Sequence, residues 1–219
     1  MSRGRLSPAG RVVLLLAMPA LLPLAAACGR PVDGVPAARS ESSSTSAEEL
    51  GKLIVMEVPS GLPRMPDEDL TPPAGRKRVE DIAGYARDPA RERAVLADYG
   101  YRYGWERFWG TESGPVTGVF VDRFDTRAGA GAYAEDLARN DAEHYGGMLS
   151  ETAAGLPGGC WVLTVADPDL RQLHGPAAFA WCVHGVFSVS ASAVTDSVDA
   201  AEEEVHAVLT AQLELLPPR

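Results

Sequence analysis

The amino-acid sequence predicts an α+β fold, in which an antiparallel sheet carries helices packed on one of its faces. Segments with the alternating or continuously apolar pattern of strands occur in neighbouring pairs joined by short turns. A capped stretch with apolar residues at helical spacing follows each pair. The order strand–strand–helix therefore occurs twice, and an internal repeat and ordinary α+β patterning both explain it.

The folded body is expected to span residues 79–219, and its first clear element is a helix at 89–99. Asp88 can cap the free N–H groups of the first turn, Pro89 suits the first helical position, and Gly100 can end the helix. The later elements expected from the same kinds of signal are strands at 101–109, 116–124, 148–153, 160–165, 179–183 and 186–191, a helix from Asp125-Thr126 to about 140, and a helix from Asp196 or Ser197 to Leu215.

Residues 50–78 are predicted to be a proline-rich coil. Leu53 to Val58 is a short apolar run that could form an edge strand, whereas the prolines from Pro59 to Pro73 forbid regular structure. The coil is either ordered over the domain or a second linker. Residues 28–49 are rich in Ser, Thr, Ala and Glu, a composition typical of a flexible tether.

Residues 1–27 are predicted to be a signal peptide. Three arginines precede an apolar run that is short for a membrane span and is interrupted by Pro19 and Pro23. The run ends in Leu24-Ala25-Ala26-Ala27-Cys28, which resembles the lipobox of bacterial lipoproteins. That resemblance implies cleavage before Cys28 and acylation of its thiol, and hence a lipid anchor on the extracytoplasmic face of the cell membrane. The alternative is an ordinary signal peptide cleaved near Ala27.

The composition is acidic, with 20 Lys and Arg against 30 Asp and Glu and a net charge of −10. Loss of Arg3, Arg5 and Arg11 with the leader would leave 17 basic residues and a charge near −13. Binding to nucleic acid or to an anionic membrane surface depends on Lys and Arg. We therefore expect no nucleic-acid partner, and attachment to the membrane through the lipid.

Cys160 and Cys182 are the two cysteines beyond Cys28, and both lie in predicted strands. In an oxidising compartment such a pair most often forms a disulfide, and two buried free thiols are the alternative. A redox pair would require the C-x-x-C spacing, which is absent.

Large aromatic residues gather in the first predicted strand. An exposed row of Tyr and Trp could stack on sugar rings of the cell wall or contact a protein partner. The alternative is that these rings fill the core and are covered by a helix. The candidate ligand-binding residues are Tyr101, Tyr103, Trp105 and Trp109.

The sequence indicates no cofactor, metal or catalytic site. The four histidines lack metal-ligand spacing, and no nucleotide-binding or nucleophile-elbow motif occurs. Two pairs of carboxylates occur in strand-end or turn positions, where turn and capping roles suffice for them. The pairs are Asp122 with Asp125 and Asp167 with Asp169.

The body resembles small secreted α+β lipoproteins of actinobacteria, including those related to the extracellular sensor domain of PknH-type receptor kinases. The residues that carry this resemblance are Gly159-Cys160-Trp161, Ala180-Trp181-Cys182 and the strand from Val186 to Ala191. It implies a disulfide-braced binding fold without catalytic residues. We therefore expect a non-enzymatic binding or sensor-like domain for a cell-envelope ligand or protein. The alternative is a cell-envelope hydrolase with an unrecognised carboxylate site.

Overall fold

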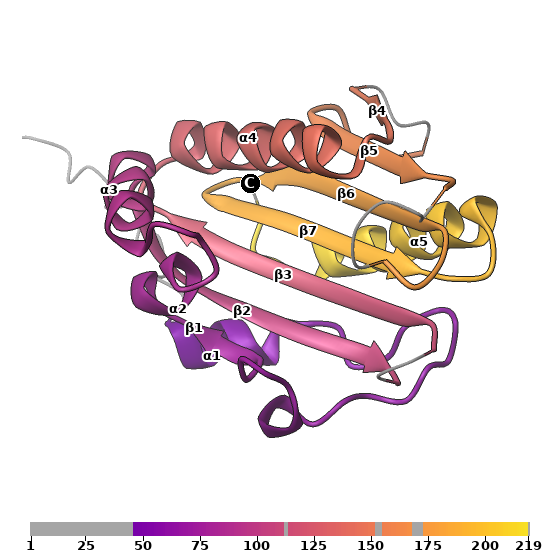
Figure 1. The fold of residues 1–219 in the computed structure, drawn as a ribbon. Helices are drawn as coiled ribbons and strands as arrows, with labels where there is room; N and C mark the ends of the chain where they lie inside the picture. Colours follow the sequence, from indigo (N-terminus) through magenta and orange to yellow (C-terminus); the bar gives the residue numbers. More distant parts are fainter. Residues whose placement is uncertain (1–45, 112–113, 152–154, 168–172, 219) are drawn as a thin grey trace, which may run out of the picture. The chain divides into compact units, whose positions relative to one another are not determined.

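The computed structural model describes residues 46–111, 114–151, 155–167 and 173–218. Seven strands form one antiparallel sheet in the order β1-β2-β3-β7-β6-β5-β4, which confirms the α+β prediction (Figure 1). The strands are β1 (Gly75–Lys77), β2 (Tyr101–Gly110), β3 (Val116–Phe124), β4 (Met148–Ser150), β5 (Cys160–Val165), β6 (Ala177–His184) and β7 (Phe187–Val194). The helices are α1 (Ala47–Lys52), α2 (Val79–Ala83), α3 (Pro89–Tyr99), α4 (Arg127–Tyr145) and α5 (Val198–Leu215), with a 3-10 turn at Asp67–Asp69.

The two long helices lie on opposite faces of the sheet, so the prediction that the helices pack on one face is wrong. Ala134 and Ala138 of α4 pack with Leu163 and Trp181. On the other face, α5 packs on the alternate residues of the strands, among them Val189, Ala191 and Cys182. Figure 1 shows α4 in front of β6 and α5 behind it. Because successive residues of a strand point to opposite faces, β6 and β7 are buried from both sides.

The first half of the body follows its local signals closely. The Asp88 side chain accepts hydrogen bonds from the first-turn N–H groups of α3, and Gly100 ends that helix in the left-handed region at φ 74°. The predicted strands become β2 and β3, which pair in register from Tyr103–Arg123 to Gly110–Val116. Thr126 caps α4. That helix continues to Tyr145, five residues beyond its predicted end, before Gly146 stops it in the left-handed region.

The second half also matches the predicted order. β6 and β7 form a hairpin about His184 and Gly185, and Ser197 caps α5. The order strand–strand–helix is therefore present twice, as β2–β3–α4 and β6–β7–α5. Because α4 and α5 cover opposite faces, the similarity of the two halves lies in the order of their elements.

The structure corrects the predictions for the segment before the body. No strand forms at Leu53–Val58. Instead Ser46 caps a short helix, α1, which includes the last three residues of the predicted tether. The edge strand of this region is β1, which pairs with β2. An isolated bridge between Arg64 and Trp109 places the proline-rich coil on the domain, so it is ordered and not a second linker.

Buried polar side chains hold this N-terminal segment on the sheet face that α5 also covers. Gln212 of α5 accepts a hydrogen bond from the Val55 N–H and donates one to the Leu53 carbonyl, at 3.0 and 2.8 Å. Glu204 of α5 accepts hydrogen bonds from the Ser60 N–H and hydroxyl at 2.9 and 2.6 Å. These side chains occupy buried positions on α5 and satisfy backbone groups that have no partner in a strand or helix.

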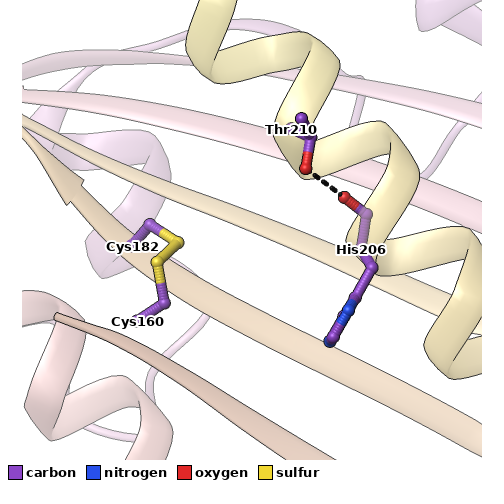
Figure 2. The surroundings of a disulfide bond; sticks show 4 residues. All are labelled: Cys160, Cys182, His206 and Thr210. Carbon is purple, nitrogen blue, oxygen red and sulfur yellow. Dashed lines mark hydrogen bonds between the residues drawn. A yellow bond between two sulfur atoms is a disulfide. The ribbon is translucent and has the colours of Figure 1, made fainter. Parts of the chain in front are cut away.

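The predicted disulfide between Cys160 and Cys182 is present, and it links directly opposed residues of β5 and β6. Figure 2 shows it beside α5, where the Thr210 hydroxyl donates a hydrogen bond to the His206 carbonyl. The bond closes a loop with a sequence separation of 22 residues.

We expect the double variant Cys160→Ala/Cys182→Ala to lose about 3 kcal/mol of unfolding free energy, because the open chain gains conformational entropy when unfolded. Urea denaturation of both proteins, with and without reductant, measures this loss. Reductant should bring the natural chain close to the double variant and leave the variant unchanged. Equal stability of the two oxidised proteins would contradict the prediction.

Among the described residues, every helix is too short or too polar to cross a membrane. Cys28, the signal peptide and the tether up to residue 45 lie outside the described residues, so those parts of the prediction remain expectations.

Candidate functional site

The face of the sheet that α4 covers keeps a pocket of about 280 Å³. Its floor comes from β2, β3, β6 and β7, and its walls come from α4 and from the segment around α2. Most of its lining is aromatic, acidic or serine. The lining residues are Ile82, Tyr85, Glu106, Phe120, Asp122, Tyr133, Leu137, Asp141, Tyr145, Phe179, Trp181, Ser190, Ala191 and Ser192.

Small residues of β7 make room for the pocket. Val189, Ala191 and Ala193 point into the core beneath α5. The alternate residues therefore face the pocket side, and they include Ser190 and Ser192. Serines at the centre of a sheet leave a low polar floor where larger side chains would fill the space between the sheet and α4.

A buried ion pair closes one end of the pocket. The Lys77 ammonium, on β1, lies 2.9 Å from the Glu106 carboxylate of β2. It also donates hydrogen bonds of 2.6 Å to the Pro73 carbonyl and the Tyr85 hydroxyl. The Tyr85 hydroxyl in turn donates to Glu106. All three ammonium hydrogens of Lys77 thus have partners inside the protein.

The pKa values of this ion pair follow from its burial and its contacts. Burial raises the pKa of Glu106, and the contacts with Lys77 and Tyr85 offset part of that rise. Burial alone would lower the pKa of Lys77, but its contacts with Tyr85 and Glu106 outweigh this and raise it. Lys77 therefore stays charged and neutralises Glu106.

Asp122 of β3 is the acid of the pocket whose pKa is raised furthest above its ordinary value. Its side chain is buried, at 7% exposure, and it forms no ion pair with a described residue. Burial and, secondarily, the charge of Glu106 raise its pKa to about 7, while the nearby Tyr101 hydroxyl lowers it somewhat. A carboxyl buried without a counter-ion resists ionisation in this way, and such groups cluster at functional sites.

Gly104 creates the space that the Asp122 carboxyl occupies. The two residues are directly opposed in β2 and β3. A Cβ at Gly104 would lie 2.1 Å from Asp122 Oδ1 and 2.8 Å from the Tyr101 hydroxyl. Any larger residue at this position must therefore displace the carboxyl.

We expect Gly104→Ala to lower the unfolding free energy by about 2 kcal/mol, because it overpacks a buried site. The loss should shrink in an Asp122→Ala background, which removes the clashing oxygen, and a double-mutant cycle in urea measures this coupling. Gly131→Ala in α4 is the control, since its Cβ would meet its nearest neighbour at 3.9 Å. Additive losses for Gly104→Ala and Asp122→Ala would show that the clash does not decide the effect.

A third acid, Asp141 of α4, lines the pocket from the helix side. Burial raises its pKa to about 6, and His144 lowers it somewhat. Beside Asp141, the rings of Tyr145, Phe179 and Trp181 form a stack, with centroids 5.0 and 6.0 Å apart and planes inclined by 13° and 12°. The pocket therefore combines an aromatic wall with acids of raised pKa.

A second hollow, of about 550 Å³, is lined by Lys77, Arg76, Arg78, Asp81 and neighbouring prolines, and it shares Tyr85 with the pocket. Arg76 and Arg78 are exposed, and both side chains pair with nearby acids. The acid of this hollow, Asp81, is already paired with Arg78, so we place the candidate site in the pocket around Asp122.

The residues predicted to bind a ligand do not form an exposed row. Trp109 is buried beneath the N-terminal segment, and Tyr101 lies on the opposite face against Phe124 and Tyr133. Trp105 is half-buried against α1, where a Cβ on Gly51 would come within 2.6 Å of its indole. Tyr103 is half-buried and contacts the Arg123 guanidinium. The placement of these four residues matches the alternative, in which the rings fill the core. Ligand binding by them stays a prediction.

The interpretation of Asp122 as a turn or capping residue is wrong, since it lies buried within β3. Asp125 instead pairs with Arg102, and Thr126 provides the cap. Glu106, Lys77 and Asp141 are not among the site residues that the sequence predicted. The signal that could have found them is the acidic or basic residue placed where a strand or helix pattern calls for an inward-facing side chain.

No group of three potential metal ligands occurs within residues 46–111, 114–151, 155–167 and 173–218. The chemistry that the pocket offers is therefore that of carboxyls, hydroxyls and aromatic rings, with one buried ion pair beside them.

Fold and site together define a small α+β domain with a pocket on one face of an antiparallel sheet. The family model described as "Domain of unknown function (DUF7373) N-terminal" matches residues 62–217, and the chain belongs to this family. No curated protein matches the chain. Among solved structures, the extracellular domain of PknH from Mycobacterium tuberculosis is similar, at 12% identity and a TM-score of 0.48 over 77% of this chain and 96% of that one.

Proposed function

We propose that this protein is a lipid-anchored, extracytoplasmic binding protein that takes up a small cell-envelope compound in the pocket around Asp122. The observation that carries the proposal is a buried carboxyl that lines a pocket, has no counter-ion and has a raised pKa. A buried carboxyl without a counter-ion destabilises the folded protein, and groups of this kind are found most often at functional sites. Aromatic walls with a few convergent polar groups are typical of small-molecule sites.

Two observations support a place outside the cytoplasm. The Cys160–Cys182 disulfide is of a kind that persists in oxidising compartments. The lipobox-like run that ends at Cys28 would supply the anchor. If so, Cys28→Ser should move the chain from the membrane fraction to the soluble fraction and abolish incorporation of a labelled fatty acid. Persistence in the membrane fraction without label would overturn the lipid anchor.

Ligand binding in the pocket is tested with a variant whose larger side chain fills the pocket. The full chain is incubated with a small-molecule extract of the cell envelope, and mass spectrometry identifies the compounds that it retains. Ser192→Trp should abolish retention, because Ser192 lies half-buried on the pocket floor. Ser192→Ala, which leaves the volume open, is the matched control. Retention of the same compounds by a folded Ser192→Trp chain would overturn the proposal.

A second candidate function is hydrolysis of a cell-envelope polymer. Two carboxyls whose pKa values are raised, Asp122 to about 7 and Asp141 to about 6, line the same pocket, and general acids need pKa values in this range. Release of soluble wall fragments by the natural chain and not by Asp122→Asn would favour this reading over binding alone.

A further inference from the structure

The charges that line the pocket are unbalanced. Glu106, Asp122 and Asp141 all contribute carboxyls, and none of the lining residues is Lys or Arg. The nearest cation, Lys77, is 2% exposed and has all its donors engaged, so it offers none to a ligand. It neutralises Glu106 and leaves the other two acids without an internal counter-ion.

Asp122 is the second observation that points to a ligand. Its carboxyl is more than nine-tenths buried and lines the pocket, and within the described residues it has the Tyr101 hydroxyl beside it but no ion pair. The titratable groups that face it are Lys77 on β1, Tyr101 and Glu106 on β2, and Tyr133 on α4. Of these, Lys77 is the one cation, and it is committed to Glu106.

Aromatic rings complete the arrangement. Tyr85, Phe120 and Tyr133 line the pocket together with the stacked rings of Tyr145, Phe179 and Trp181. The negative face of an aromatic ring attracts an organic cation, most strongly where water is excluded. An anion would meet two acids without a neutralising donor, and a neutral ligand would leave the Asp122 carboxyl without a partner.

We propose that the pocket binds an organic cation, an amine or ammonium group on a small apolar body, whose charge pairs with Asp122. This inference rests on the proposed function, and it names the chemical class of the ligand. The ligand's cation provides the counter-ion that Asp122 lacks within the protein. The aromatic rings of the pocket contact the apolar part of the ligand.

The pair predicts a pH dependence. Ionised Asp122 binds the cation, and the carboxyl takes up a proton as pH falls through its pKa of about 7. Affinity for a cation should therefore be higher at pH 8 than at pH 5.5. Asp141, with a pKa of about 6, contributes in the same direction.

The test uses three probes of similar shape and different charge: benzylamine, benzyl alcohol and benzoate. Each is titrated into the full chain in the same detergent at pH 8 and pH 5.5. The indole N–H resonance of Trp181, which lines the pocket, reports binding there. We expect benzylamine to bind at least ~10-fold tighter than benzyl alcohol at pH 8, a preference that weakens at pH 5.5, and no binding of benzoate.

Asp122→Asn should abolish the preference for benzylamine and leave the affinity for benzyl alcohol unchanged. Glu203→Gln, an exposed position on α5, removes the same charge from the other face and should change neither affinity. Equal binding of the amine and the alcohol, an amine preference that survives in Asp122→Asn, or no shift of Trp181 with any probe would overturn the cation assignment. The proposed function would still stand or fall on the Ser192→Trp retention experiment.

Discussion

Replacement of Arg107 by Met should lower the free energy of unfolding by about 4 kcal/mol. The Arg107 side chain is buried on β2, and its guanidinium donates hydrogen bonds to the carbonyls of Ile54, Val55 and Gly51 at 2.9, 2.7 and 3.2 Å. Met keeps most of the apolar stem but donates nothing, so three buried acceptors lose a charged donor. Each such loss costs ~1–3 kcal/mol.

Urea denaturation followed by tryptophan fluorescence measures this loss. Arg102→Met is the matched control, because Arg102 lies on the same strand and forms an exposed ion pair with Asp125. Exposed pairs contribute ~0–1 kcal/mol, so this variant should stay close to the natural chain. Equal losses for the two variants would show that Arg107 does not hold the N-terminal segment on the sheet.

Asp122→Asn should make the protein more stable than the natural chain at pH 8, by up to about 4 kcal/mol if the full difference in pKa is felt. The unfolded carboxyl ionises above a pKa of 3.8, whereas the folded one keeps its proton until about pH 7. Between these values the folded state binds more protons than the unfolded state. The unfolding free energy therefore falls as pH rises from about 4 to about 7, and the Asn variant lacks this loss.

Unfolding free energies of both proteins at pH 4, 6 and 8 test this expectation. The two curves should lie closest at pH 4 and separate as pH rises. A smaller slope should remain in Asp122→Asn, because the pKa of Asp141 is also raised, to about 6. Parallel curves would mean that Asp122 ionises normally in the folded protein, and the binding site would lose its main support.

The elements whose ends carry a local signal were predictable from the sequence. Asp88, Thr126 and Ser197 accept hydrogen bonds from first-turn N–H groups, which depends on residues within one helical turn. Gly100 ends α3 in the left-handed region for an equally local reason. Alternating or apolar runs likewise located β2, β3, β5, β6 and β7, while the domain boundaries remain predictions.

The face that each helix covers was not predictable in the same way. An apolar stripe shows that a helix has a buried side, but α4 and α5 each follow a strand pair and carry similar stripes. The sheet face that each helix covers depends on the path of the chain after β3 and β7. The run from Leu53 to Val58 misled for a related reason, because Gln212 and Arg107 satisfy its backbone from distant parts of the chain.

The candidate site shows the same division. Tyr101 and Trp109 read as ligand-binding aromatics, but both pack in the core, because big rings fill small sheets whenever a helix or coil covers them. Lys77, Glu106, Asp122 and Asp141 are spread over 65 residues of sequence and carry no motif spacing. Pairing of β1, β2 and β3 brings the first three together, and α4 adds the fourth.

By itself, the sequence determined the α+β class, the helix caps, the main strands and the cysteine pair, because capping, periodicity and turn chemistry act over a few neighbouring residues. The tertiary structure alone decided that α4 and α5 lie on opposite faces of the sheet and that Gly104 leaves room for the Asp122 carboxyl. It also decided that Lys77 forms its ion pair with Glu106. Burial and the absence of a counter-ion are properties of residues brought together from distant positions, and no local pattern records them.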